Sequence, residues 1–205
     1  MSANKFVVEA TVQDRTYYEG PCEIYDGERH HARYFSYPTN AGLVVGDCYS
    51  VAFTVDRPAK EVWRYLRDLN LWQSEHQNYF SGVLGDLEGK TFRMSDKPND
   101  PGPHYYEMLK VIPEYLMIIN QPIPSDGTTA GWPGRPGVSP GFHVFLLQEY
   151  EGKSTATVHM EHSALADTQD VQEALKPWRD IVENNAIPKW RKFIPTLRRL
   201  VYEGR

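Results

Sequence analysis

A long amphipathic segment closes the chain after a series of short alternating segments, and this order constrains the fold more than any other feature. The segment Thr168–Tyr202 predicts a helix. Its apolar stripe begins with Val171, Leu175, Trp178, Val182 and Asn185 at helical spacing. Pro188 is expected to kink or break it, and apolar residues continue the stripe beyond. The chain therefore predicts a sheet that packs against a long C-terminal helix.

The clearest strands are Phe142–Tyr150 and Lys153–Ser163, which predict a hairpin that turns at Glu151-Gly152. A two-residue turn places Gln148 opposite Thr155, and each further pair lies one residue farther from the turn on both strands. One face then collects mostly polar residues and is expected to face solvent. The other face is expected to point inward, and it carries His143, Phe145, Leu147, Ala156, Val158, Met160 and His162.

Upstream of this hairpin, Tyr49–Val55 alternates as a strand, and Pro58 suits the first turn of a helix over Ala59–Asp68. A second short helical piece is expected around Asn70–Gln77. Further strands are expected at Val83–Leu87 and Lys90–Met94, joined as a hairpin by the Glu88-Gly89 turn.

His104–Val111 is expected to be a strand with Tyr105, Glu107, Leu109 and Val111 on one face, and Tyr115–Gln121 is expected to be the next strand. The stretch Pro122–Gly141 is so rich in proline and glycine that it predicts a long loop, which carries Trp132.

Residues 1–47 differ from the rest and predict an N-terminal extension that packs on a main domain of residues 48–205. Lys5–Val12 could form a strand, whereas Gln13–Asn40 is rich in Tyr, Gly, Pro and charge. His30-His31 lies in this extension and is expected at the surface.

Charge and cysteine content exclude several classes of function. The net charge is −5 and the basic clusters are short, which argues against a nucleic-acid partner. Cys22 and Cys48 lack metal or disulfide spacing and predict free thiols in a reducing compartment. The chain shows neither a signal peptide nor a membrane span, so we expect a cytoplasmic protein. A homodimer is left open.

The stretch Val51–Trp72 (VAFTVDRPAKEVWRYLRDLNLW) resembles the opening of the START-like, or SRPBCC, superfamily, which includes pollen allergens and polyketide cyclases. There a strand leads to two short helices, antiparallel strands follow, and a long helix ends the domain. The resemblance covers about residues 48–203 and implies an α+β helix-grip fold, in which a curved antiparallel sheet wraps around the terminal helix and an apolar cavity lies between them. Members of the superfamily carry lipids, bind hormones, cyclise polyketides or perform lyase and hydrolase chemistry, so the fold does not name the reaction.

Ionisable groups that point inward are the candidates for chemistry, because burying charge costs free energy unless the charge is paired or used. The strand patterns predict such positions for Glu107, His143 and His162, with Tyr105 on the face of Glu107. A histidine beside a carboxylate can act as a general acid or base near neutral pH. These groups could also simply satisfy one another, and a register slip of one residue would turn them outward.

A metal site is the weaker interpretation. His159 and Glu161 share one face of their strand while His162 lies on the other, so the run His159–His162 cannot hold one ion. A mixed site of Glu107, His143 and His162 is supported only by analogy with zinc-dependent phloroglucinol hydrolases of the superfamily. No metal or other cofactor is therefore expected.

Several further side chains are expected to contact a ligand. They are Trp72, His76, Tyr79, Trp132, Phe145, Met160, Trp178, Val182 and Asn185. Tyr and Trp suit such a site because they combine a flat apolar body with a polar group.

Three functions follow from these features. The first is a cofactor-independent cyclase, lyase or hydrolase that acts by acid/base catalysis on a small aromatic or polyketide-like molecule. The second is a non-catalytic carrier of a hydrophobic ligand or lipid, and the third is a metal-dependent hydrolase of an aromatic ketone.

Overall fold

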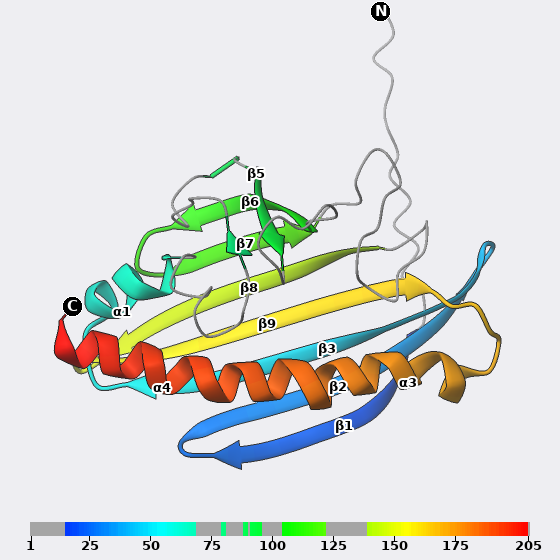
Figure 1. The fold of residues 1–205 in the computed structure, drawn as a ribbon, viewed down its shortest axis with the longest axis horizontal. Helices are drawn as coiled ribbons and strands as arrows, with labels where there is room; N and C mark the ends of the chain where they lie inside the picture. Colours follow the sequence, from blue (N-terminus) through cyan, green and yellow to red (C-terminus); the bar gives the residue numbers. More distant parts are fainter. Residues whose placement is uncertain are drawn as a thin grey trace, which may run out of the picture.

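A computed structural model describes residues 15–68, 79–80, 88–89, 91–95, 104–121 and 139–204. In these residues one antiparallel sheet is combined with helices on one face (Figure 1). The sheet runs in the order β1-β2-β3-β9-β8-β7-β6-β5-β4. Its strands are β1 (Thr16–Tyr25), β2 (Glu28–Thr39), β3 (Gly42–Val55), β4 (Tyr79–Phe80), β5 (Thr91–Ser95), β6 (His104–Ile112), β7 (Leu116–Gln121), β8 (Ser139–Tyr150) and β9 (Lys153–Leu165). Pairing of β3 with β9 brings the two halves of the chain together.

The helices are α1 (Ala59–Leu66), α3 (Val171–Ile181) and α4 (Ile187–Glu203), with a π-helical segment, η1 (Val182–Ala186), between the last two. The carboxylate of Asp170 starts α3 by accepting hydrogen bonds from the backbone N–H groups of Gln172 and Glu173. Gly204 ends α4 in the left-handed conformation, which glycine adopts without steric cost. Figure 1 shows α3, η1 and α4 as one rod along the sheet. A helix-grip type of α+β architecture is therefore present.

The core lies between this rod and the sheet. Leu175, Phe193 and Leu197 on the helices are fully buried, and so are Val51, Phe145 and Val158 on the strands. Burying each large apolar side chain contributes roughly 1.5–3 kcal/mol relative to leaving it in water. The amphipathic stripe of the C-terminal segment thus finds the partner face that the alternating strands predicted.

The hairpin β8–β9 has the predicted register and faces. Gln148 pairs with Thr155, and the turn residues Glu151 and Gly152 both have positive φ, as a two-residue hairpin turn requires. Phe145, Leu147, Ala156, Val158 and Met160 are buried on the inner face. Strand β7 is also found where it was predicted.

The inner face of β6 is not the one predicted. Tyr106 is 2% exposed and Met108 is 0% exposed, whereas Leu109 is 39% exposed, so Glu107 lies on the outer face. The cause is a bulge in the pairing of β6 with β7 between Met108 and Lys110, where β6 has one extra residue. Strict alternation back from Val111, which does pack on the core, therefore gave the wrong face for Glu107.

The terminal helix is not broken at Pro188. This residue lies in the first turn of α4, directly after the π-helical segment, and the chain stays helical. The extra residue in η1 shifts the phase of the inner stripe, so Ile187 is 4% exposed while Asn185 is exposed. The predicted inward position of Asn185 is therefore wrong.

The elements that precede residue 48, where the resemblance begins, also differ from the expectation. The predicted strand Tyr49–Val55 is the second half of β3, which starts at Gly42 and follows two other strands. The predicted boundary after residue 47 thus falls within β3. The first expected helix is α1; the second, around Asn70–Gln77, lies outside the described residues, as do Val83–Leu87 and most of the predicted Pro122–Gly141 loop.

Candidate functional site

Three ionisable side chains lie together on the predominantly apolar inner face, on the three neighbouring strands β3, β9 and β8. Asp47 and His162 are direct cross-strand partners in β3 and β9. His143 lies on β8 opposite Met160, which is two residues before His162. Asp47 is 2% exposed and His162 is 8% exposed, while His143 is half-buried. We call this group the Asp47–His162–His143 relay.

The relay is connected by hydrogen bonds. Nδ1 of His162 lies 3.3 Å from Oδ1 of Asp47, and Nε2 of His162 lies 2.9 Å from Nε2 of His143. An ionised Asp47 accepts only, so it selects the His162 tautomer with its proton on Nδ1. In that tautomer Nε2 of His162 accepts from Nε2–H of His143, which leaves Nδ1 of His143 as the basic nitrogen.

The surroundings of His143 favour its neutral form. Burial, with a smaller contribution from the charge of His162, holds the pKa of His143 well below its ordinary value. The ring of Tyr106 lies 5.8 Å away at a tilt of 54°, and the ring of His162 lies 5.1 Å away and nearly perpendicular. A neutral imidazole at physiological pH is able to accept a proton from a bound molecule.

Two glycines make room for His162. A side chain at Gly141 would place its Cβ 2.4 Å from Cδ2 of the His162 ring, and one at Gly46 would lie 2.1 Å from the His162 carbonyl oxygen. The pairing of β8 with β9 is also irregular between Ser139 and Phe142, next to Gly141. The close approach of the two imidazoles therefore depends on the missing side chain of Gly141.

The predicted catalytic residues separate into two groups. His143 and His162 lie on the inner face and contact each other. Glu107 lies across the sheet on the outer face, paired with Asn120. Tyr105 belongs to β6, and its side chain is outside the described part of the structure.

The predicted ligand-contacting residues are also divided. Phe145, Met160, Trp178 and Val182 are buried between the sheet and the helix rod, whereas Asn185 is exposed. Tyr79 is placed in β4, with its side chain not described. Trp72, His76 and Trp132 lie outside the described residues.

Sequence reasoning missed Asp47 and misplaced His30. Asp47 is in phase with the apolar residues Val45, Tyr49 and Val51 of the same strand, and this alternation was the signal that could have found it. His30 was expected at the surface but is 0% exposed, because β2 is an integral strand of the sheet.

A metal centre finds little support in the described residues. Among them, no three His, Cys, Asp or Glu side chains are grouped so that they could hold a metal ion. The mixed site proposed from sequence also fails in its donor set, because Glu107 lies on the opposite face of the sheet from the two histidines.

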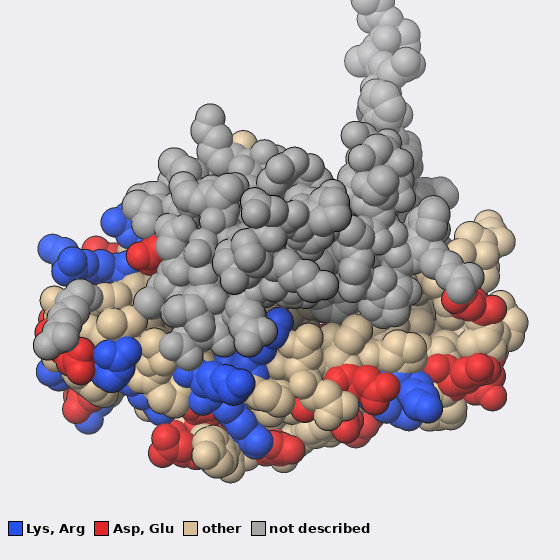
Figure 2. Space-filling model, viewed as in Figure 1, with Lys and Arg blue, Asp and Glu red and all other residues tan. Residues whose placement is uncertain are grey.

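Charges of both signs are mixed on the surface. On the face seen in Figure 2, Lys and Arg side chains of the described residues alternate with Asp and Glu side chains. Among the described helices, none is both long enough and apolar enough to cross a membrane.

Comparison with known proteins supports the fold. No protein-family model matches the chain, and no curated protein matches its sequence. A protein from Arthrobacter aurescens superposes with a TM-score of 0.52 at 12% identity, covering 76% of this chain and 86% of its own. A truncated norcoclaurine synthase from Thalictrum flavum gives a TM-score of 0.50 at 13% identity, covering 77% and 94%. At these identities the likeness shows a shared fold alone, which agrees with the helix-grip architecture that the sequence predicted.

Proposed function

We propose that this protein is a cofactor-independent enzyme that moves a proton on or off a small aromatic or polyketide-like molecule held between the sheet and the helix rod. The observation that carries the proposal is the hydrogen-bonded Asp47–His162–His143 relay on the inner face of the sheet. A buried carboxylate and two imidazoles cost free energy to desolvate, and such groups are concentrated at functional sites.

In the proposed mechanism His143 is the general base. Its Nδ1 takes a proton from an acidic C–H or O–H group of the substrate and becomes an imidazolium. The Nε2 proton of His143 then passes to Nε2 of His162, and the resulting His162 cation is stabilised by the carboxylate of Asp47 at 3.3 Å. Reversal of these steps returns the proton to another atom of the substrate.

The side chains around the relay favour an apolar substrate. Phe145 and Met160 flank His143 on β8 and β9, and Ile119 is its cross-strand neighbour on β7. All three are buried and carry no charge. An apolar wall with a few polar groups is typical of sites that bind small organic molecules. The norcoclaurine synthase that shares the fold is, by its name, also an enzyme.

The test is proton exchange in deuterated water, because it needs no knowledge of the final product. Resorcinol-type phenols and aromatic β-diketones would be incubated with the protein, and deuterium uptake at their acidic carbon would be followed by NMR. We expect the protein to accelerate exchange of at least one compound, and His143→Gln to reduce this acceleration about 100-fold or more.

His159→Gln is the matched control. His159 lies on the outer face of β9, bonded to Ser50 at 2.9 Å, and its substitution should leave the exchange rate unchanged. Equal exchange by the wild type and His143→Gln across every responsive compound would overturn the catalytic proposal.

A carrier of a hydrophobic ligand is the second candidate, and the predominantly apolar inner face favours it. A carrier needs a binding site but no proton transfer. Native mass spectrometry that finds an unmodified molecule bound to the purified protein, together with no acceleration of exchange, would support this alternative.

A further inference from the structure

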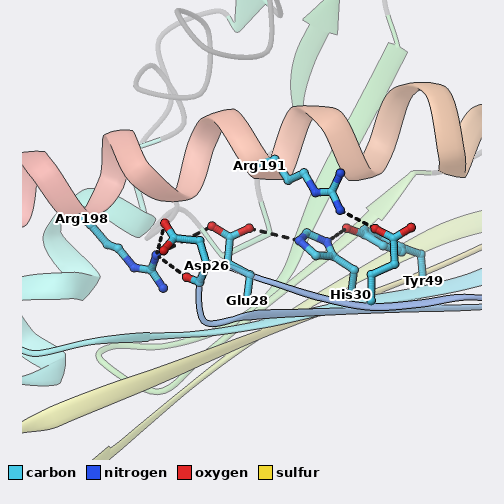
Figure 3. A network of polar contacts seen from close by, with 7 residues as sticks. Asp26, Glu28, His30, Tyr49, Arg191 and Arg198 are labelled. Carbon is cyan, nitrogen blue, oxygen red and sulfur yellow. Dashed lines mark hydrogen bonds and ion pairs between the residues drawn. The ribbon is translucent and has the colours of Figure 1, made fainter.

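A second polar cluster lies on the inner face, extending from Tyr49, two residues along β3 from Asp47 of the relay, to β2. Glu28 and His30 on β2 are both 0% exposed, and Tyr49 on β3 is 1% exposed. Oε2 of Glu28 lies 3.1 Å from Nε2 of His30, and Nδ1 of His30 lies 2.7 Å from the Tyr49 hydroxyl (Figure 3). The proposed reaction does not use these groups.

The helix α4 covers this cluster with two arginines. Arg198 lies 3.8 Å from Oε1 of Glu28 and 3.9 Å from a carboxylate oxygen of Asp26, and it donates hydrogen bonds to the backbone oxygens of Thr54 and Asp26. Arg191 pairs with Glu23 of β1 and lies over the ring of Tyr25 at 4.6 Å. Figure 3 shows both arginines reaching from the helix toward the strands.

The charges around the cluster balance only when Glu28 and His30 together hold one proton. The cations Arg191 and Arg198 then match the anions Glu23 and Asp26 in number, and the Glu28–His30 pair is neutral as a whole. A second proton on the pair would add a positive charge beside two arginines, and loss of the proton would leave a negative charge in a fully buried place. In the one-proton state Nδ1–H of His30 donates to the Tyr49 oxygen, whichever partner carries the shared proton.

The direction in which the pKa of each group is shifted agrees with this charge balance. Burial raises the pKa of Glu28 to about 7, against the opposing effect of Arg198. Burial, and next to it the charge of Arg191, lowers the pKa of His30. The environment therefore favours the protonated form of the Glu28 carboxyl and the neutral form of the His30 imidazole.

We propose that Glu28 and His30 share one proton and form a latch, which keeps the terminal helix docked on the sheet with little sensitivity to pH. When the helix leaves the sheet, water reaches the pair and the pKa of each group returns toward its ordinary value. At mildly acidic pH the open pair also holds one proton in total, as Glu⁻ and His⁺, so opening neither takes up nor releases protons. The latch does not depend on the relay being catalytic.

When only one of the two groups can titrate, the docking of the helix should become sensitive to pH, and the two single variants should respond to pH in opposite directions. In Glu28→Gln only His30 titrates, with a lowered pKa in the docked state, so the open state gains a proton as pH falls below about 6.5 and the helix loosens in acid. In His30→Gln only Glu28 titrates, with a raised pKa in the docked state, so the helix loosens as pH rises from about 4.5 to about 7.

Native-state hydrogen exchange of the full chain measures this directly. Between about pH 5.5 and pH 7.5, α4 amides of Glu28→Gln should lose roughly tenfold in protection toward the acidic end, and those of His30→Gln should lose roughly tenfold toward the alkaline end. The wild type and Glu151→Gln, an exposed turn variant, should change about threefold or less. The same sign of change in both latch variants, or a wild type as sensitive as either, would overturn the latch.

A measurement on the wild type keeps the proposal testable if a variant fails to fold. The nitrogen chemical shifts of the His30 imidazole, followed by NMR, should stay nearly constant from about pH 5 to about pH 6.5. An ordinary histidine titration in this range would show that the pair does not hold its proton. A protein with an intact latch that does not accelerate deuterium exchange of any phenol or diketone would contradict only the catalytic proposal. A protein that accelerates this exchange but fails the latch tests would contradict only the latch.

Discussion

His162 reaches His143 because the residue beneath its ring, Gly141, has no side chain. A methyl group there would lie 2.4 Å from Cδ2 and 3.1 Å from Nε2 of His162, well inside van der Waals contact. The ring would have to rotate away, and the 2.9 Å contact between the imidazoles would be lost. At the scale of single residues, the relay therefore rests on a glycine as much as on its ionisable members.

Gly141→Ala is expected to destabilise the protein by about 1–3 kcal/mol, because the added methyl overpacks a buried site. Urea denaturation gives the free energy of unfolding. The matched comparison is the same substitution in a His162→Ala background, where the two closest atoms are absent and the cost should fall by at least about half. Equal cost in both backgrounds would mean that Gly141 does not make room for His162.

Two irregular elements decide which side chains face the core. The bulge in β6 selects Tyr106 and Met108 over Glu107, and the π-helical segment η1 selects Ile187 over Asn185. Each inserts one residue into a regular repeat, so all residues beyond it change face. The η1 segment also ends two residues before Pro188, which has no N–H group to donate to the preceding turn.

Deletion of Asn185 is expected to destabilise the protein by only about 1 kcal/mol or less, because removing the extra residue of a π-turn restores an α-helical turn and leaves α4 in nearly the same phase. Deletion of Lys192, an exposed residue within the regular part of α4, instead rotates the rest of that helix by about 100°. The buried residues Ile194, Leu197 and Val201 then leave the sheet, so this deletion should cost at least about 3 kcal/mol. Thermal or chemical unfolding compares the two variants; equal costs would contradict the interpretation of η1 as a one-residue insertion.

In the part of the chain that the structure describes, the buried carboxylates and imidazoles gather in two clusters, and the unfolding free energy of the whole molecule should report this. His143 has a pKa held well below its ordinary value by burial, so the folded protein leaves it neutral while the unfolded chain binds a proton below about pH 6.5. A group of this kind stabilises the fold above its unfolded pKa and loses that contribution as the pH falls.

Between about pH 6.5 and pH 5.5 we therefore expect the wild type to lose about 1 kcal/mol of stability that His143→Gln does not lose. Urea denaturation of both proteins at the two pH values measures the difference. His159→Gln, which removes a histidine from the outer face, should keep the wild-type pH dependence. A wild type and His143→Gln with parallel pH profiles would show that His143 is not held neutral.

Local periodicity was sufficient for the elements whose repeats are regular. The register of β8–β9, the helix α1 and the long terminal helix follow from patterns within the chain, because side-chain direction repeats every two residues in a strand and every 3.6 in a helix. For the same reason, the inward positions of His143 and His162 could be predicted from the hairpin alone.

Tertiary structure decided everything that depends on an extra residue or on a distant partner. A bulge or a π-turn is selected by how well the neighbouring elements pack, so Glu107 and Asn185 could not be placed by counting. The pairing of β3 with β9 brings Asp47 to His162 across 115 positions of sequence, and the docking of α4 covers Glu28 and His30. These juxtapositions arise only when the apolar faces of sheet and helix are buried together, and no local pattern in the sequence encodes them.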